Sequence, residues 1–125
     1  MRRGKPASSL IFRSTHCPHA VCHNATGPVT TPITVTTPLS TKKATLGFGW
    51  HLFLPQNELS RELFLAAGAR YLDVYWSSSL RPDGHGKVGD CAHYCLPGPV
   101  DDWNQMLLYL LSTAEPSHKR ERHAA

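Results

Sequence analysis

The sequence of 125 residues lacks an apolar run long enough to cross a membrane. A transmembrane helix needs about 20 apolar residues, and the short run at residues 10–12 is too brief even for the core of a signal peptide. The Gly-x-Ser-x-Gly pattern of a nucleophile elbow is also missing. We therefore expect neither a membrane segment nor an elbow serine within this sequence.

Acidic residues are few, with 9 Asp and Glu against 13 Lys and Arg, and the pI is near 9.0. Nucleic-acid-binding segments interleave basic residues with stacking aromatic side chains, and the basic clusters of this sequence contain none. We read the clusters as solvated tails and expect no nucleic-acid partner. They lie near the two ends, at Arg2, Arg3, Lys5, Lys119, Arg120 and Arg122.

Large apolar residues are sparse outside residues 46–113, which hold all three tryptophans and most of the leucines. A core of that size is marginal unless it is cross-linked or packs on something else. Residues 24–45 are rich in threonine and contain dispersed prolines, so we expect a solvated linker or a long loop there. The tail over residues 114–125 is expected to be disordered.

Three segments carry secondary-structure signals. Residues 55–67 have apolar residues at helical spacing and are followed by a glycine, which predicts a helix. Residues 70–76 are rich in apolar and β-forming residues, which predicts a buried strand. A last helix is expected from Pro99, with Asp101 and Asp102 in the first turn, where the helix dipole favours carboxylates. This order indicates an αβ step of a layered α/β fold.

Asp90 and His93 form the most informative motif, since they are spaced as Asp-x-x-His in a segment with two cysteines. In one tight turn the carboxylate can accept a hydrogen bond from imidazole Nδ1, which leaves Nε2 free to take a proton from a serine hydroxyl. The spacing predicts the base half of a Ser-His-Asp triad.

Around this motif the sequence resembles the C-terminal part of the PC-esterase, or trichome birefringence-like, family of polysaccharide O-acetyltransferases. The resemblance covers residues 46–111 well and residues 10–22 loosely. It rests on Leu72-Asp73-Val74, Arg81-Pro82-Asp83-Gly84-His85, Asp90-Cys91-Ala92-His93-Tyr94-Cys95-Leu96-Pro97-Gly98 and Trp103-Asn104, with Phe12-Arg13-Ser14-Thr15, His19 and Cys22 upstream.

The resemblance implies an α/β fold, the C-terminal portion of an SGNH-hydrolase-like three-layer α/β/α domain, with a disordered Thr/Pro-rich N-terminal region. We expect residues 1–23 to be a remnant of an upstream family block and residues 24–45 to be the linker or loop. The C-terminal part of the domain would then occupy residues 46–113, and residues 114–125 would form a basic tail.

For the complete family enzyme the resemblance implies a double displacement, in which a serine takes an acetyl group and a sugar hydroxyl then accepts it. His93 would act as general base and then as general acid, and Asp90 would hold its tautomer. The partners implied are a polysaccharide acceptor and an acetyl donor, with no cofactor, in the Golgi or secretory pathway. No residue decides between a transferase and an esterase.

The family's Gly-Asp-Ser block, which carries the nucleophile, is missing from this sequence. The only Gly-Asp dipeptide is Gly89-Asp90, and Cys91 follows it. Because a general base without a nucleophile has nothing to activate, we expect a partial enzyme that is inactive alone.

A turn is predicted over residues 81–85, where proline presets φ and glycine permits a reversal. This block can be read as purely structural or, by the family resemblance, as a block that recurs near the family's catalytic loop, with no chemical role assigned to Asp83 or His85. The weak candidates for substrate binding are Arg13, His19, Arg81, Asp83 and His85.

The four cysteines form two close pairs, Cys17 with Cys22 and Cys91 with Cys95, which permit three disulfide connectivities or a shared metal site. The family resemblance implies that Cys91 and Cys95 each pair with a distant cysteine. Cys22 is the natural partner for one of them, and we expect the partner of the other to belong to the missing half of the domain. Nearby histidines keep a zinc module as a weaker alternative, although the spacings are not those of a zinc knuckle, and we expect no metal. Cys91 as a nucleophile beside His93 is less favoured still.

Asn24-Ala25-Thr26 fits the N-glycosylation pattern, although a plain loop is the simpler interpretation. Two hypotheses for the whole chain remain besides the zinc module. The first is an acetyltransferase or esterase whose serine lies on another segment. The second is a non-catalytic remnant that binds glycan or protein.

Overall fold

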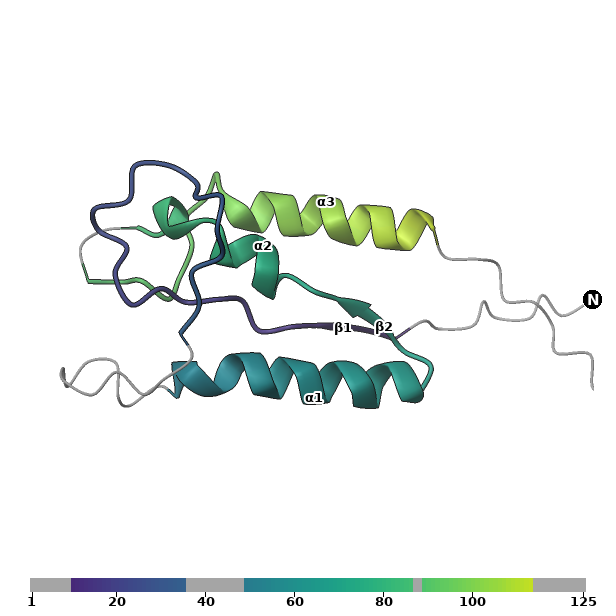
Figure 1. Ribbon diagram of the computed structural model, residues 1–125. Coiled ribbons are helices and arrows are strands. Elements are labelled where there is room, and N and C mark those ends of the chain that lie inside the picture. Colours follow the sequence, from purple (N-terminus) through teal and green to yellow (C-terminus); the bar gives the residue numbers. More distant parts are fainter. Residues whose placement is uncertain (1–9, 36–48, 87–88, 114–125) are drawn as a thin grey trace, which may run out of the picture.

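The computed structural model describes residues 10–35, 49–86 and 89–113. Two short parallel strands lie between two long helices (Figure 1). Strand β1 (Ile11–Arg13) pairs with β2 (Arg70–Leu72), and Phe12 lies opposite Tyr71. Helix α1 (Phe53–Ala66) covers one face of the strand pair and α3 (Pro99–Ser112) the other. The layered α/β arrangement expected from the sequence is therefore present.

Helix α1 confirms the predicted helix, with a start two residues earlier than expected. At its C-terminal end Gly68 adopts a φ of +79°, a left-handed conformation that side chains other than glycine rarely take. The N–H of Gly68 donates to Leu65 O, and the N–H of Ala69 donates to Phe64 O. This pair of bonds is a Schellman motif, which ends the helix and turns the chain into β2.

The predicted strand over residues 70–76 is wrong beyond Leu72. The chain turns instead into a short helix, α2 (Tyr75–Ser79). Asp73 Oδ1 accepts a hydrogen bond from the Tyr75 N–H at 3.0 Å, which supports the first turn of α2. Ser78 Oγ donates to Val74 O at 2.5 Å. Local side-chain to backbone bonds therefore overrode the strand propensity of this apolar segment.

Helix α3 starts at Pro99, as predicted, and Asp101 belongs to the helix start. The Asp101 carboxylate accepts from the N–H of Gly98 at 2.8 Å, and the Asp101 N–H donates to Gly98 O at 2.9 Å. Farther along α3, the Arg70 side chain donates to Leu110 O, which ties β2 to this helix. Two short 3₁₀ turns complete the fold, at Trp50–Leu52 and Pro82–Gly84, the second within the predicted turn.

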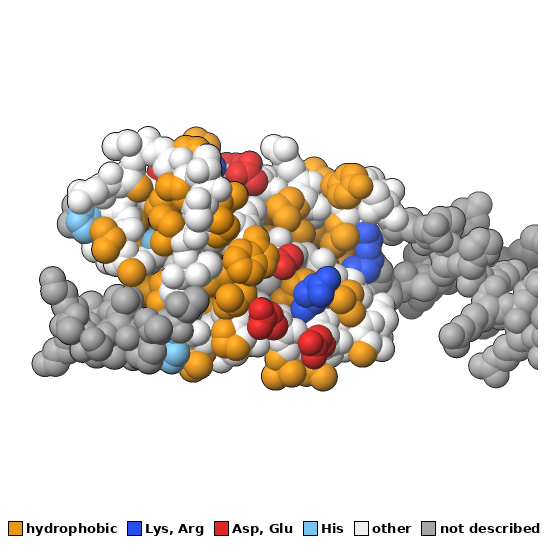
Figure 2. Space-filling view, viewed as in Figure 1, with side chains coloured by type: hydrophobic (Ala, Val, Ile, Leu, Met, Phe, Trp, Pro, Cys, Tyr) orange, Lys and Arg blue, Asp and Glu red, His pale blue; other side chains and the backbone are white. Residues whose placement is uncertain are grey.

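The core lies where the carboxyl ends of the two strands meet the loop after β1. Val74 and Tyr75 are almost fully buried there, together with Cys17 and His19. In the middle of β1, Phe12 stacks on Phe64 of α1 with ring centroids 4.0 Å apart. Both long helices also carry exposed apolar residues, and apolar side chains lie among charged ones on the face shown in Figure 2.

Residues 24–35, the described part of the expected linker, form irregular backbone that is fastened to α2. The N–H of Val29 donates to Leu80 O at 2.9 Å, and the N–H of Ile33 donates to Ser79 O at 3.0 Å. Val35 is buried. This part is a packed loop rather than a free spacer, because its backbone groups find partners on α2. The rest of the expected linker and the basic tail lie outside the described residues, and the domain boundaries stay predictions.

Within the described segments, every helix is too short or too polar to span a bilayer.

Candidate active site

Asp90 and His93 form a hydrogen-bonded pair in the loop before α3. His93 Nδ1 lies 2.9 Å from Asp90 Oδ2 and 3.1 Å from Oδ1. The His93 side chain is 81% exposed, and among the described residues none is hydrogen-bonded to its Nε2. The carboxylate thus fixes Nδ1 as the protonated nitrogen and leaves Nε2 as a base open to a reacting group.

The same carboxylate also closes its own loop. Asp90 Oδ1 accepts the N–H groups of His93 at 3.0 Å and Ala92 at 3.1 Å. These bonds, first the backbone N–H and then the side chain of His93, lower the pKa of Asp90 to about 2. Asp90 therefore stays ionised over the whole range in which an imidazole can act as a base.

A disulfide joins this loop to the segment after β1. Cys22 and Cys91 are bonded, with a Cα–Cα distance of 5.5 Å and a sequence separation of 69. The expected bond between Cys22 and one of the two downstream cysteines is thus confirmed, and the partner is Cys91. A half-cystine at position 91 also has no thiolate to serve as a nucleophile beside His93.

The other downstream cysteine, Cys95, carries a free, exposed thiol. Cys17 is also free but is buried, and its thiol donates toward Ile33 O at 3.3 Å. Because Cys22 and Cys91 are joined in a disulfide, their sulfur atoms cannot serve as zinc ligands. Across the described segments, no three His, Cys, Asp or Glu residues are grouped to hold a metal ion.

Three consecutive carbonyl groups of the loop are held by histidine residues. The His19 N–H donates to Cys91 O at 2.9 Å. The ring of His16 reaches Ala92 O through Nε2 at 2.7 Å, and the ring of His85 reaches His93 O through Nδ1 at 2.9 Å. From the sequence, His16 had no expected role beyond a possible zinc cluster. Its position close to His19 and Cys22 was the one sequence feature that could have indicated a place near the site.

Tyr94 packs beneath the same loop. Its ring stacks on the His85 ring with centroids 4.1 Å apart, and its hydroxyl lies 2.8 Å from Cys17 O and 3.0 Å from Ser78 O. Burial raises the pKa of Tyr94, so the hydroxyl is a proton donor at any physiological pH. Tyr94 thereby ties the loop of residues 89–98, which carries the proposed catalytic pair and is called the catalytic loop below, to α2.

The candidates for substrate binding mostly contact protein in this structure. His19 has no exposed surface, so its side chain cannot contact a polysaccharide in this arrangement. Arg81 and Asp83 form a two-pronged ion pair at 2.9 and 3.1 Å, and the guanidinium lowers the pKa of the Asp83 carboxyl. Arg13 lies over the Trp103 ring, 5.3 Å from its centroid. Any contact of these side chains with substrate remains a prediction.

Asn24, the glycosylation candidate, is exposed in the loop beside the disulfide. Its place is compatible with a modification at the surface, which stays a prediction.

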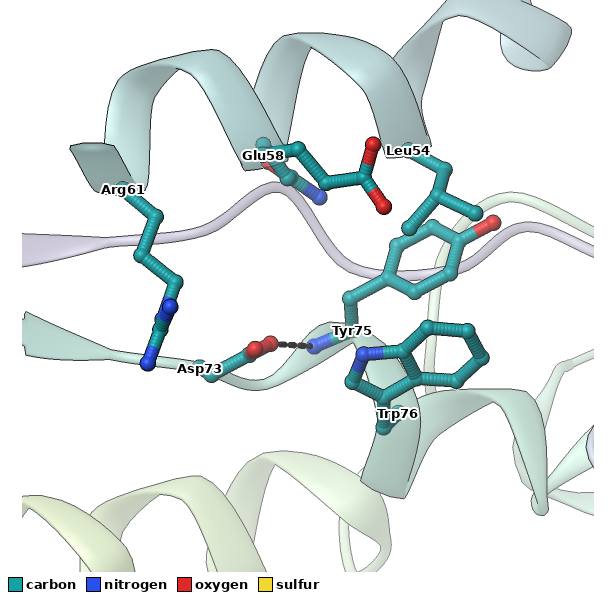
Figure 3. Close-up of a pocket in the computed structure, with 7 residues that line it drawn as sticks. Leu54, Glu58, Arg61, Asp73, Tyr75 and Trp76 are labelled. Atoms are coloured by element: carbon teal, nitrogen blue, oxygen red, sulfur yellow. Dashed lines mark hydrogen bonds between the residues drawn. The ribbon is translucent and has the colours of Figure 1, made fainter. Parts of the chain in front are cut away.

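A pocket of about 340 Å³ opens between α1 and the segment that joins β2 to α2 (Figure 3). Glu58 and Arg61 extend into it from α1, and Asp73 and Trp76 face them from the other side. Sequence reasoning did not single out this pocket, because its residues come from elements far apart in the chain. Leu54, Asn57 and Tyr75 complete the lining.

An exposed imidazole whose Nδ1 is held by an ionised aspartate is the arrangement that the acid–base part of a serine-hydrolase-type site requires, and here it lies on an α/β unit. A family model described as "GDSL/SGNH-like Acyl-Esterase family found in Pmr5 and Cas1p" matches residues 3–110. The chain belongs to this PC-esterase family, as its motifs predicted.

Plant proteins are among the relatives. Protein trichome birefringence-like 20 of Arabidopsis thaliana is 45% identical over 58 residues, which cover 37% of this chain and 12% of that protein. Xyloglucan O-acetyltransferase 1 of Arabidopsis thaliana is 39% identical over 80 residues, covering 48% of this chain and 19% of that protein. Xyloglucan O-acetyltransferase 2 of Populus trichocarpa is 37% identical over 67 residues, covering 41% and 16%.

The chain thus spans less than a fifth of the length of these relatives. No solved structure gives a significant match.

Proposed function

We propose that this chain supplies the general base and general acid of a serine-type O-acetyltransferase or esterase that acts on polysaccharide. The observation that carries the proposal is the contact of 2.9 Å between Asp90 Oδ2 and His93 Nδ1, with the other ring nitrogen open to solvent. The names of the relatives, two of them xyloglucan O-acetyltransferases, support a polysaccharide acceptor.

In the first half-reaction, His93 Nε2 takes the proton of the serine hydroxyl as Oγ attacks the carbonyl carbon of the acetyl donor. The same Nε2 then gives this proton to the leaving group, and an acetyl-serine remains. In the second half-reaction a sugar hydroxyl passes its proton to Nε2 and attacks the acetyl-serine. Serine regains the proton when it leaves, and the sugar keeps the acetyl group. With water in place of the sugar, the same steps would release acetate.

Asp90 keeps its negative charge throughout these steps. Its contribution is to hold the imidazole in one orientation and to stabilise the imidazolium that forms in each half-reaction. The lowered pKa of Asp90 fits this role, because a carboxylate that stays ionised keeps its hydrogen bond to the imidazole.

The serine itself would come from another segment. In the described part of the chain no serine is hydrogen-bonded to His93, and Ser14, Ser78 and Ser79 are fully buried. A buried hydroxyl cannot meet a polysaccharide. We therefore propose that this chain is the Asp-His portion of the site and is inactive until a Gly-Asp-Ser segment of the family type is joined to it.

The secretory pathway, and within it the Golgi, is the proposed location. The Cys22–Cys91 disulfide supports it, because such bonds persist in oxidising compartments and are rare in the cytosol. The relatives' role in modifying polysaccharide points the same way.

A second candidate is a non-catalytic remnant that binds glycan. The observation that favours it is the pocket beside Trp76, whose side chain is 47% exposed on the molecule and offers an aromatic face. In that case Asp90 and His93 would be inherited but idle.

The test is acetyl transfer by the polypeptide that contains this sequence together with the serine segment. His93→Ala should lower kcat by about 10³-fold or more, and Asp90→Asn by about 10²–10⁴-fold with KM little changed, because the base and its tautomer are lost. His23→Ala, at an exposed histidine, is the matched control and should keep full activity. Wild-type turnover in His93→Ala would overturn the proposal. Glycan binding without any turnover would support the second candidate.

A further inference from the structure

The inference concerns His16, His19 and His85, the histidines that hold the carbonyls of the catalytic loop, and it rests on the proposed role of His93. Three residues in a row, 91 to 93, have their carbonyl oxygens bound by these histidines. The last of these carbonyls belongs to His93 itself. Its partner, His85, is bound in turn by the buried His19, at 2.7 Å between His85 Nε2 and His19 Nδ1. The loop is thus held through a chain of ring nitrogens.

The positions of the protons in this chain follow from the acceptors at its ends. A carbonyl oxygen can only accept, so His85 must carry its proton on Nδ1 to bind His93 O. In a neutral ring Nε2 of His85 is then an acceptor. His19 must therefore donate from Nδ1 to reach it. Both rings are fixed as Nδ1–H tautomers.

The contact between His19 and Ser79, at the far end of this series of hydrogen-bonded rings, agrees with this assignment. His19 Nε2 faces Ser79 O at 3.3 Å, the longest of the three contacts, which measure 2.7, 2.9 and 3.3 Å. Two neutral imidazoles carry two N–H groups, so one of three contacts must lack a proton. Burial lowers the pKa of both His19 and His85, which keeps the pair neutral at physiological pH. The proton is missing at the Ser79 end, away from the catalytic loop.

His16 completes the arrangement from another direction. Its Nε2 must be protonated to bind Ala92 O, and its Nδ1 is buried without a hydrogen-bond partner among the described residues. Its ring lies against the Trp103 ring with centroids 5.4 Å apart. His16 is therefore held as the opposite, Nε2–H, tautomer.

We infer that His85 is a positioning residue for the proposed catalytic His93: its Nδ1–H holds the His93 carbonyl, and His19 fixes the tautomer that makes this bond possible. The backbone of an exposed catalytic residue is thereby held from the buried side, while Asp90 orients the ring from the solvent side. Such placement matters, because displacement of a catalytic group by about 1 Å can cost about 10²-fold in rate.

The first test is long-range ¹H–¹⁵N NMR on the uniformly labelled chain with its disulfide intact, which reports the protonated nitrogen of each ring. We expect Nδ1–H for His19, His85 and His93, and Nε2–H for His16. Most neutral histidines in solution favour Nε2–H, so three Nδ1–H rings would be a specific signature. An Nε2–H tautomer at His85 would overturn the inference, whatever the activity of the protein.

The second test compares two substitutions of similar polarity. The amide nitrogen of His85→Asn can take the place of Nδ1, whereas that of His85→Gln reaches toward the position of Nε2 and abandons the His93 carbonyl. We expect backbone amide exchange at Ala92 and His93 to be about tenfold faster in His85→Gln, and largely restored in His85→Asn. His23→Gln is the control. Equal exchange in the Asn and Gln variants would contradict a positioning role.

These measurements need no substrate and no serine, so they can fail or succeed independently of the proposed function. A protein with the expected tautomers and no acetyl transfer would keep the structural inference and remove its catalytic meaning. Acetyl transfer with an Nε2–H ring at His85 would support the proposed function and overturn the structural inference.

Discussion

At the scale of single residues, the site combines one exposed histidine with three that are half or fully buried. Asp90 and His93 could be predicted from their spacing, because an Asp-x-x-His turn brings carboxylate and imidazole together with few alternatives. His16, His19 and His85 could not be assigned in this way. The partner of His16 lies 76 positions away in sequence, and His19 and His85 are 66 positions apart, so no local pattern encodes these contacts. His85 lies only 8 positions from His93, but its ring is also held by the distant His19.

The buried histidines make stability depend on pH. Burial lowers the pKa of His16, His19 and His85 in the folded state, whereas in the unfolded chain they titrate near about 6.5. Below that value the unfolded chain binds more protons, so stability is fully present above about pH 6.5 and falls as pH drops toward the lowered values. Asp90 adds a separate loss only at lower pH, as the pH falls from the ordinary aspartate pKa of about 3.9 toward its lowered pKa of about 2.

We therefore predict that the melting temperature decreases between pH 7 and pH 5, by about 4–8 °C for each kcal/mol lost in a domain of this size. Thermal unfolding by circular dichroism at a series of pH values measures it. His85→Asn should flatten the slope, and His23→Asn should leave it unchanged. A melting temperature that rises as the pH falls through this range would show that the three rings are protonated in the folded state.

At the scale of elements, the two long helices could be predicted within two residues, because apolar spacing and terminal residues agree with each other. The length of strand β2 was overestimated, because the apolar run that follows Leu72 is equally compatible with a helix. The hydrogen bond that the Tyr75 N–H donates to Asp73 Oδ1 favours the helix. For the Thr/Pro-rich segment, composition left a linker and a loop as alternatives, and the described part is a packed loop. Composition describes how a segment prefers solvent, but not which carbonyls of α2 its N–H groups can reach.

The disulfide is the strongest single link between elements. It joins the segment after β1 to the catalytic loop across a sequence separation of 69. Closing a loop of this length stabilises a protein by about 2–5 kcal/mol, with the mechanism of stabilisation model-dependent.

We predict that Cys22→Ser with Cys91→Ser lowers the free energy of unfolding by about that amount and speeds amide exchange in residues 89–95 more than in α1. Urea unfolding followed by fluorescence, with hydrogen exchange resolved by residue, measures both. Cys95→Ser, at the free exposed thiol, is the matched control and should change neither. A double variant as stable as the wild type would mean that the bond does not hold the catalytic loop.

At the scale of the whole molecule, the chain presents the Asp90–His93 pair, the proposed half of a catalytic site, on part of an α/β layer. The family match runs over most of the chain, whereas the relatives extend far beyond the aligned part. Both long helices expose apolar side chains, and His93 is 81% exposed. These features agree with the proposal that the serine is brought to His93 by another segment of a larger domain.

The central claim is that His93 activates a serine that becomes acetylated. The most direct measurement is to mix the polypeptide carrying both the serine segment and this sequence with p-nitrophenyl acetate, quench it in acid, and locate the acetyl group by peptide mass spectrometry. The account predicts acetyl-serine in the wild type and in His23→Ala, with none above background in His93→Ala, and no acetyl-serine on this chain alone. Acetyl-serine at the wild-type level in His93→Ala, or on a serine within this chain, would contradict it.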